Sequence, residues 1–297
     1  LRLSSVDRFL IDLMEGTPNP FGGKLMLLGG DWKQLLPVVR GVHGCGVLDF
    51  TLKKCGLWSN FQVLHLKKNM RLEEGSQEFA KFLNSVGCGE PPVQKSDGRN
   101  VMPEDMCTES EEELIEWTYG NDALNVDDCD SVWETSILTV LNEVSLEIND
   151  KVLDKLPGNS TIFSSHDSCA SEKSTLAIPV ELYNSLTPSG LPPHELTLKK
   201  GCMLILLRNL NVPRAQCNGT RLRLVDMDEK LLTCENLQEG PYYKDIVLLP
   251  RIEMESQDKS EPSHNFRRLQ FPVRLAYCLT INKSQGRSLS KVNIFNI

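Results

Sequence analysis

The sequence predicts an α/β protein in which parallel strands and helices are joined to a group of short antiparallel strands. Apolar residues recur at helical spacing in residues 3–14 and 144–153. Short apolar runs at residues 24–28 and 136–141 are typical of buried strands in a parallel sheet. From residue 196 to residue 249, strand-like runs alternate with turn residues, which indicates a small antiparallel barrel.

The first 87 residues are predicted to form two helices and two strands. The helices cover residues 3–14, with Gly16 as the stop, and residues 79–86, ending at Gly87. The strands cover residues 24–28 and 61–66. Ligands of open α/β sheets lie beyond the carboxyl ends of the strands, which is where Gly29-Gly30-Asp31 falls. Gln34, just after this turn, is therefore a candidate to sense a terminal phosphate.

Residues 88–135 are predicted to be an acidic connector with a short helix around residues 114–117. Residues 100–150 hold 15 of the 40 acidic residues and no Lys or Arg. The net charge of −8 therefore does not describe the rest of the chain. Outside this segment, 32 basic residues outnumber the other 25 acidic ones. The rest of the chain can present a positive channel to phosphates.

The second half begins with a strand at residues 136–141. Asn142 is the predicted cap of a helix that stops at Pro157-Gly158. The strand-like runs of the barrel are residues 196–207, 220–225, 231–234 and 246–249. Arg208, Arg221 and Arg223 on these runs are typical of charges on a strand surface, and DNA contact is an alternative.

Composition excludes several kinds of site. No apolar run approaches the roughly 18 to 20 residues of a membrane-spanning helix. The ten cysteines include no Cys-x-x-Cys pair and the five histidines are scattered, so we expect reduced thiols and no zinc site.

The most informative stretch is residues 275–289. Ala276, Thr280, Lys283, Ser284 and Arg287 repeat at intervals of three and four, which on a helix would bring them to one face. Gln285 and Gly286 follow where such a helix would end, and an amide there can meet the phosphate or base of a ligand.

Three segments resemble motifs of the petite integration frequency (PIF) helicases and the related helicases of Helitron transposons. These are residues 29–38, residues 66–71 and residues 280–286, the last preceded by a similar run at residues 267–272. The resemblance implies that Thr280, Asn282, Lys283 and Ser284 face single-stranded DNA. It also implies that Gln34 and Arg71 act on the γ-phosphate as catalytic residues and that Gln285 and Gly286 approach the nucleotide.

The resemblance further implies a RecA-like helicase core with an inserted small β-barrel. Residues 1–87 would be the end of the first RecA-like domain and residues 88–135 the acidic connector. Residues 136–195 with 265–297 would be the second RecA-like domain, and residues 196–264 the barrel. The implied activity is ATP-dependent DNA unwinding in the 5′–3′ direction, with Mg²⁺ as cofactor, single-stranded and forked DNA as partners, and a nuclear or mitochondrial location. DNA repair, recombination and telomere maintenance are the implied processes.

Two features depart from the family pattern. The 297 residues contain no Gly-x-x-x-x-Gly-Lys-Ser/Thr phosphate cradle, so we expect this chain alone not to hydrolyse ATP at the rate of a helicase. Arg287 stands where the family usually has Gln or Glu. Two alternatives stay open: a catalytically inactive, transposon-derived nucleic-acid-binding fragment, and an adaptor whose acidic segment recruits a basic partner.

Overall fold

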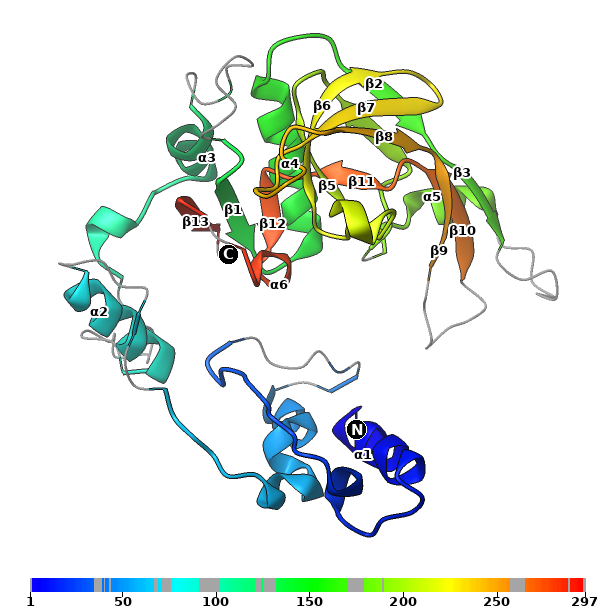
Figure 1. Cartoon of the computed structure of the whole chain (residues 1–297). Helices are drawn as coiled ribbons and strands as arrows, with labels where there is room; N and C mark the ends of the chain where they lie inside the picture. The colour runs from blue at the N-terminus through cyan, green and yellow to red at the C-terminus, as the bar shows by residue number, and fades with distance from the viewer. Residues whose placement is uncertain are drawn as a thin grey trace. The chain divides into compact units, whose positions relative to one another are not determined.

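The chain divides into two compact units, Leu1–Cys107 and Thr108–Ile297 (Figure 1). The computed structural model describes residues 2–34, 39, 41–42, 44–66, 69–70, 76–90, 102–120, 124, 132–169, 179–188, 190–256, 265–287 and 289–295. Each unit is described by itself, and the domain limits given above stay predictions.

The described part of the first unit is helical. The predicted first helix is α1 (Arg2–Leu13), which Gly16 ends in the left-handed conformation at φ 77°. The second predicted helix, α2 (Gln77–Cys88), extends past Gly87 and is capped by Gly89 at φ 75°. Its other helical elements are short 3₁₀ turns: η1 (Pro20–Gly23), η2 (Gly44–Phe50), η3 (Leu52–Lys54), η4 (Gly56–Asn60) and η5 (Glu104–Met106).

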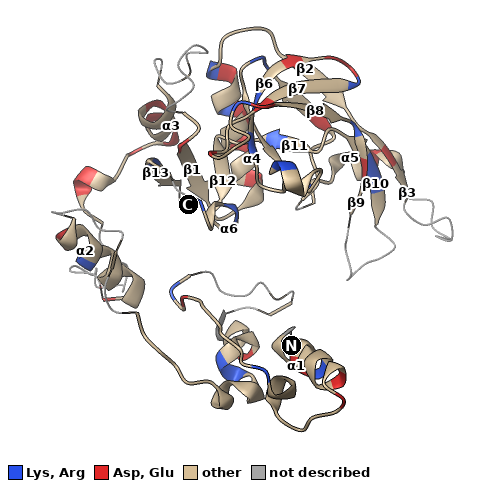
Figure 2. Ribbon diagram, in the orientation of Figure 1, with Lys and Arg blue, Asp and Glu red and all other residues tan. Residues whose placement is uncertain are grey.

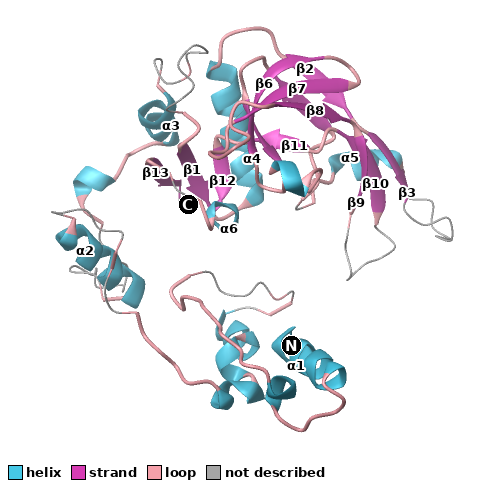
Figure 3. Cartoon of the chain, viewed as in Figure 1, coloured by secondary structure: helices cyan, strands magenta, loops and turns pink. Residues whose placement is uncertain are grey.

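The strands predicted at residues 24–28 and 61–66 are wrong. The described part of the first unit contains no strand (Figure 3). Leu25, Leu27 and Leu66 expose 98%, 91% and 102% of their surface. An apolar run becomes a strand only where a neighbouring strand takes up its backbone hydrogen bonds, and no described segment does so here.

A three-stranded parallel sheet is central to the second unit. β1 (Thr135–Thr139) lies between β12 (Cys278–Thr280) and β13 (Lys291–Phe295) and is buried along its length. The helix α4 (Asn142–Lys155) follows β1 and buries Val144, Ile148 and Val152. The predicted strand and helix are thus confirmed, although the cap residue is Leu141 and Asn142 is already helical.

The acidic helix α3 (Glu111–Tyr119) packs within the second unit. It buries Leu114, Ile115 and Tyr119. Its carboxylates Glu111 and Glu116 pair with Lys151 and Lys155 of α4, each at 2.7 Å. Figure 2 colours the acidic residues of α3 red. This part of the acidic segment therefore belongs with the RecA-like sheet of the second unit, and some of its charge is used internally.

The inserted strands form a five-stranded antiparallel sheet in the order β11-β5-β6-β7-β8. β11 and β8 are its outer strands, so closure into a barrel stays a prediction. β11 lies beyond residue 264, the predicted end of the insertion. The bounds are β5 (Met203–Leu206), β6 (Arg221–Met227), β7 (Leu231–Asn236), β8 (Ile246–Pro250) and β11 (Val273–Leu275).

Smaller sheets and short helices complete the second unit. β2 pairs with β4, and β10 lies between β3 and β9. The remaining bounds are β2 (Thr161–Ser164), β3 (His166–Cys169), α5 (Val180–Ser185), β4 (Glu195–Leu198), η6 (Val212–Arg214), β9 (Ile252–Glu255), β10 (Phe266–Gln270) and α6 (Ile281–Ser284).

One hydrophobic core joins the parallel sheet to the five-stranded sheet. It contains Ile137 of β1 and Ile148 of α4 together with Leu204 and Leu222 of the antiparallel strands. The two sheets therefore pack against each other through this shared core. None of the helices that the structure describes is long and apolar enough to cross a membrane.

Candidate nucleic-acid and nucleotide interface

The motif residues lie where β12 meets α6. Thr280 ends the strand and caps the four-residue helix, and Gly286 then turns the chain at φ 81° toward β13. The predicted helix over residues 276–280 is wrong. Cys278 to Thr280 are extended because they pair with Ile137 to Thr139 of β1, and the N–H of Ile137 also donates to the carbonyl of Tyr277 (3.0 Å).

Two buried polar side chains of α4 hold the chain just before this motif. The side-chain oxygen of Asn149 accepts from the backbone N–H of Tyr277 (2.9 Å) and of Cys278 (3.0 Å). Its amide nitrogen and the hydroxyl of Ser145 both donate to the carbonyl of Cys278 (2.8 Å each). The sequence analysis missed both residues. Their signal was a polar pair four residues apart on the apolar face of the helix.

The structure brings the four predicted DNA-binding residues to one edge of the parallel sheet. Thr280 lies beside Thr139, at the carboxyl ends of both strands. Asn282 is exposed, and Lys283 and Ser284 are partly buried. The hydroxyl of Ser284 donates to the carbonyl of Ile281 (2.8 Å), so it stabilises the short helix. This is the edge of an α/β sheet at which ligands bind.

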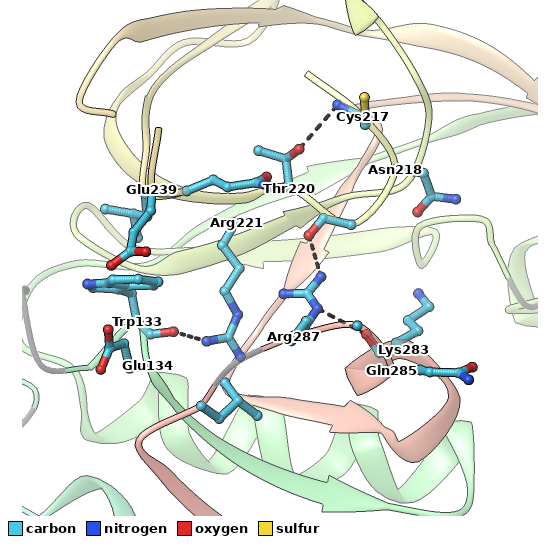
Figure 4. A pocket seen from close by; sticks show the side chains of 15 residues that line it. Trp133, Glu134, Cys217, Asn218, Thr220, Arg221, Glu239, Lys283, Gln285 and Arg287 are labelled. Carbon is cyan, nitrogen blue, oxygen red and sulfur yellow. Dashed lines mark hydrogen bonds between the residues drawn. The ribbon is translucent and has the colours of Figure 1, made fainter. Parts of the chain in front are cut away.

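A pocket of about 560 Å³ adjoins this edge, between the motif and the antiparallel strands (Figure 4). Lys283, Gln285 and Arg287 line it from the motif side. Asn218 and Arg221 line it from the insertion. Its volume is within the ordinary range for small-ligand sites.

Arg287 connects the motif to the insertion. Its Nε donates to the carbonyl of Lys283 (3.0 Å), and its guanidinium also donates to the carbonyl of Gly219 in the turn before β6. The residue that departs from the family pattern is therefore a bridge between two elements that form the pocket. This role could not be predicted from local sequence patterns, because the two elements are far apart along the chain.

Burial lowers the pKa values of the basic residues at this pocket. Desolvation, with the nearby charges of Arg274 and Arg287, lowers the pKa of Lys283 to about 8. Desolvation, opposed by Tyr119 and reinforced by the charge of Arg287, lowers the pKa of Arg221 to about 10. Each shift means that the positive form costs free energy in this environment.

The predicted nucleotide-contacting residues are divided between the two units. Gln34 is exposed in the first unit, and its N–H donates to the carbonyl of Asp31 (3.3 Å). Arg71 lies outside the described residues. Gln285 and Gly286 are exposed in the second unit. No group of three or more His, Cys, Asp or Glu side chains within the described ranges could hold a metal ion.

Known proteins similar to this chain come from one family. Residues 2–97 match the model of the PIF1-like helicases, and residues 181–227 match that of the 2B domain of the DNA helicase Pif1. The human ATP-dependent DNA helicase PIF1 is 24% identical over 299 residues, which is 98% of this chain. These matches support a PIF-type helicase. The second match extends over α5 to β6, the start of the antiparallel insertion.

Curated relatives are considerably longer than the part that aligns. The chain spans 41% of the human protein and 32% of the ATP-dependent DNA helicase PIF7 of Trypanosoma brucei brucei, to which it is 23% identical.

Solved structures of Pif1 helicases share the fold. The Pif1 helicase of Candida albicans superposes with a TM-score of 0.63 at 21% identity and covers 99% of this chain and 63% of that one. The Pif1 helicase from Bacteroides, in complex with ADP-AlF3 and ssDNA, gives 0.60 at 18% identity and covers 98% and 60%. The chain therefore has the mixed α/β, RecA-like core of a Pif1 helicase.

Proposed function

We propose that this chain is part of an ATP-dependent DNA helicase that moves 5′ to 3′ and holds single-stranded DNA on Thr280, Asn282, Lys283 and Ser284. The observation that carries the proposal is the position of these four residues at the carboxyl edge of the parallel sheet, in a chain of this family. The curated relatives are named ATP-dependent DNA helicases, and a Bacteroides relative has been solved with ssDNA.

The chemistry of the four residues suits a nucleic-acid backbone. The ammonium group of Lys283 offers a point charge to a phosphate, and the hydroxyl of Thr280 and the amide of Asn282 offer hydrogen bonds. On the backbone, none of these groups distinguishes one base from another. Binding should therefore tolerate any sequence and weaken as salt is added.

We propose that Gln34, Arg71, Gln285 and Gly286 contact the nucleotide, with ATP and Mg²⁺ as cofactors. A guanidinium such as that of Arg71 can hold two phosphate oxygens at once. Changes at the nucleotide would then shift the Thr280–Lys283 segment along the DNA strand. Forked DNA as substrate and a nuclear or mitochondrial role in repair, recombination or telomere maintenance belong to the same proposal. A Pif1 structure at forked dsDNA supports that substrate.

The DNA site is tested with the variant Lys283→Ala. We expect a single-stranded oligonucleotide to bind roughly tenfold more weakly, because the variant loses one charge-assisted hydrogen bond. The salt slope should fall by about 0.7, which corresponds to one phosphate contact on a single strand. Fluorescence anisotropy of a labelled oligo-dT across a salt series measures both. Unchanged affinity and slope would refute the assigned DNA site.

A second candidate is nucleic-acid binding without motor action. The two functions differ in the response to nucleotide. The DNA affinity of a motor differs between the protein with an ATP analogue bound and the protein with ADP bound, whereas that of a passive binder stays the same. Measuring oligo-dT affinity of the chain and of the longest natural product of its gene, with each nucleotide, separates them.

A further inference from the structure

Three positive side chains meet at the pocket between the motif and the insertion. They are Arg221 from β6, Lys283 from α6 and Arg287 from the following turn (Figure 4). Arg221 is 4% exposed, and Lys283 and Arg287 are partly buried. A buried positive charge is normally paired with a carboxylate.

No ion pair to a carboxylate satisfies these three groups within the described residues. Arg221 donates hydrogen bonds to the backbone carbonyls of Trp133, Thr135 and Ala276, and Arg287 donates to backbone carbonyls as well. The buried Nε of Arg221 has no hydrogen-bond partner. These buried cations therefore lack a directly paired carboxylate, and an anion placed beside them would relieve the cost of their burial.

The remaining lining residues make the pocket asymmetric. Asn218 and Gln285 lie near Lys283 at one end, whereas Trp133, Glu134 and Glu239 lie at the other (Figure 4). Amide and basic groups suit phosphate oxygens. An indole ring suits a stacked base, and carboxylates accept hydrogen bonds from the amino groups of bases. A ligand with an anionic end and an aromatic, amino-bearing end matches this division.

We infer that this pocket binds the phosphate of a nucleotide at Lys283, Arg287 and Asn218, with the attached sugar and base extending toward Trp133. The inference deepens the proposed function and rests on it for the source of the nucleotide. That source is either one unit of a DNA single strand or a free nucleotide, since both present the same chemistry. Arg221 acts here through its buried charge and needs no contact with the ligand.

The test uses three variants of the 297-residue chain that each change the net charge by −1. Arg287→Gln removes a cation from the pocket, and Asn218→Asp adds an anion while leaving the bridge from Arg287 to Gly219 intact. Arg214→Gln is the matched control, because Arg214 is exposed on the same insertion and does not line the pocket. Affinities for oligo-dT and for ADP are measured by anisotropy and calorimetry, after thermal melting has shown that each variant is folded.

We expect Arg287→Gln and Asn218→Asp to weaken binding at least about fivefold relative to Arg214→Gln, the effect of losing or opposing one charged contact. Weakening for oligo-dT alone identifies the DNA backbone as the source, and weakening for ADP alone identifies a free nucleotide. Weakened binding of both ligands means that the pocket accepts either a unit of the DNA strand or a free nucleotide. If Arg287→Gln does not fold, Asn218→Asp decides. Affinities equal to those of the control for both ligands, or a wild-type chain that binds neither, would overturn the inference.

The proposed DNA site is tested separately with Asn282→Ala, which lies outside the pocket. If this variant loses oligo-dT affinity while the pocket variants match the control, the DNA site stands and the pocket assignment fails. If Asn282→Ala and Thr280→Ala bind normally while the pocket variants are weakened, the pocket stands and the DNA site is wrong.

Discussion

Lys283 is the residue on which most of the chemistry depends. It lies at the edge of the parallel sheet and lines both the large pocket and a small neighbouring one that also contains Thr280 and Arg274. Partial burial and the charges of Arg274 and Arg287 lower its pKa to about 8. The lysine is therefore charged at neutral pH but loses its proton more readily than an exposed lysine.

This lowered pKa predicts a pH dependence of DNA binding. The ammonium form binds phosphate and predominates below the pKa, so affinity should fall several-fold as the pH rises from about 7 to about 9. Anisotropy titrations with oligo-dT at constant ionic strength measure this. Lys283→Arg keeps its charge over the same range and should show little change. An equal fall in both proteins would mean that another group titrates.

A buried ion pair makes a second prediction at the residue scale. Arg268 and Asp167 are both 0% exposed at the side chain and contact each other at 2.5 Å. Asp167→Asn leaves a buried guanidinium without its counter-charge, which is expected to lower the free energy of unfolding by about 3–5 kcal/mol. Asp226→Asn is the control, because the Lys200–Asp226 pair is 64% and 62% exposed and should contribute little. Urea denaturation compares the two, and equal midpoints would contradict the prediction.

At the scale of elements, α4 positions the motif through Ser145 and Asn149. Asn149→Ala leaves the N–H groups of Tyr277 and Cys278 without their acceptor, and we expect the free energy of unfolding to fall by about 2–4 kcal/mol. DNA affinity should fall as well, because α6 follows directly. Glu147→Ala, exposed on the same helix, should change neither. A stability loss without a loss of affinity would show that α6 keeps its position without this clamp.

The elements also show what the sequence alone could predict. α1, α4 and the strands of the insertion were predicted because their apolar residues repeat with the period of the element that buries them. The helix predicted across residues 276–280 failed because the same spacing of polar residues is compatible with a strand that β1 pairs. The hydrogen-bond partners of Asn149 and Arg287 could not be predicted, since they are 128 and 68 residues away.

At the scale of the whole molecule, the net charge is negative although the charge around the motif is positive. The chain is acidic overall, yet Glu111 and Glu116 are engaged by lysines of α4 and the pocket at the motif is basic. Attraction of nucleic acid therefore depends on this local field rather than on the net charge.

The sequence predicts limited catalysis by these 297 residues. Without a Gly-rich Lys-Ser/Thr cradle, most of the binding free energy for the phosphates of ATP is missing, so we expect no DNA-stimulated ATP hydrolysis at the rate of a helicase. Phosphate release is measured with and without oligo-dT. The control is the longest natural product of the gene, and vigorous stimulated hydrolysis by the 297-residue chain would contradict the prediction.

The order of strands in the parallel sheet has a consequence for synthesis on the ribosome. Ile137 of β1 is paired with Cys278 and Asn293, so both neighbours of this strand are made about 140 residues or more after it. The five-stranded sheet, by contrast, takes four of its strands from Met203–Pro250. The antiparallel strands can thus associate while β1 still has two unpaired edges. Such edges attract other strands, so a nascent chain stalled before Cys278 would be prone to aggregation.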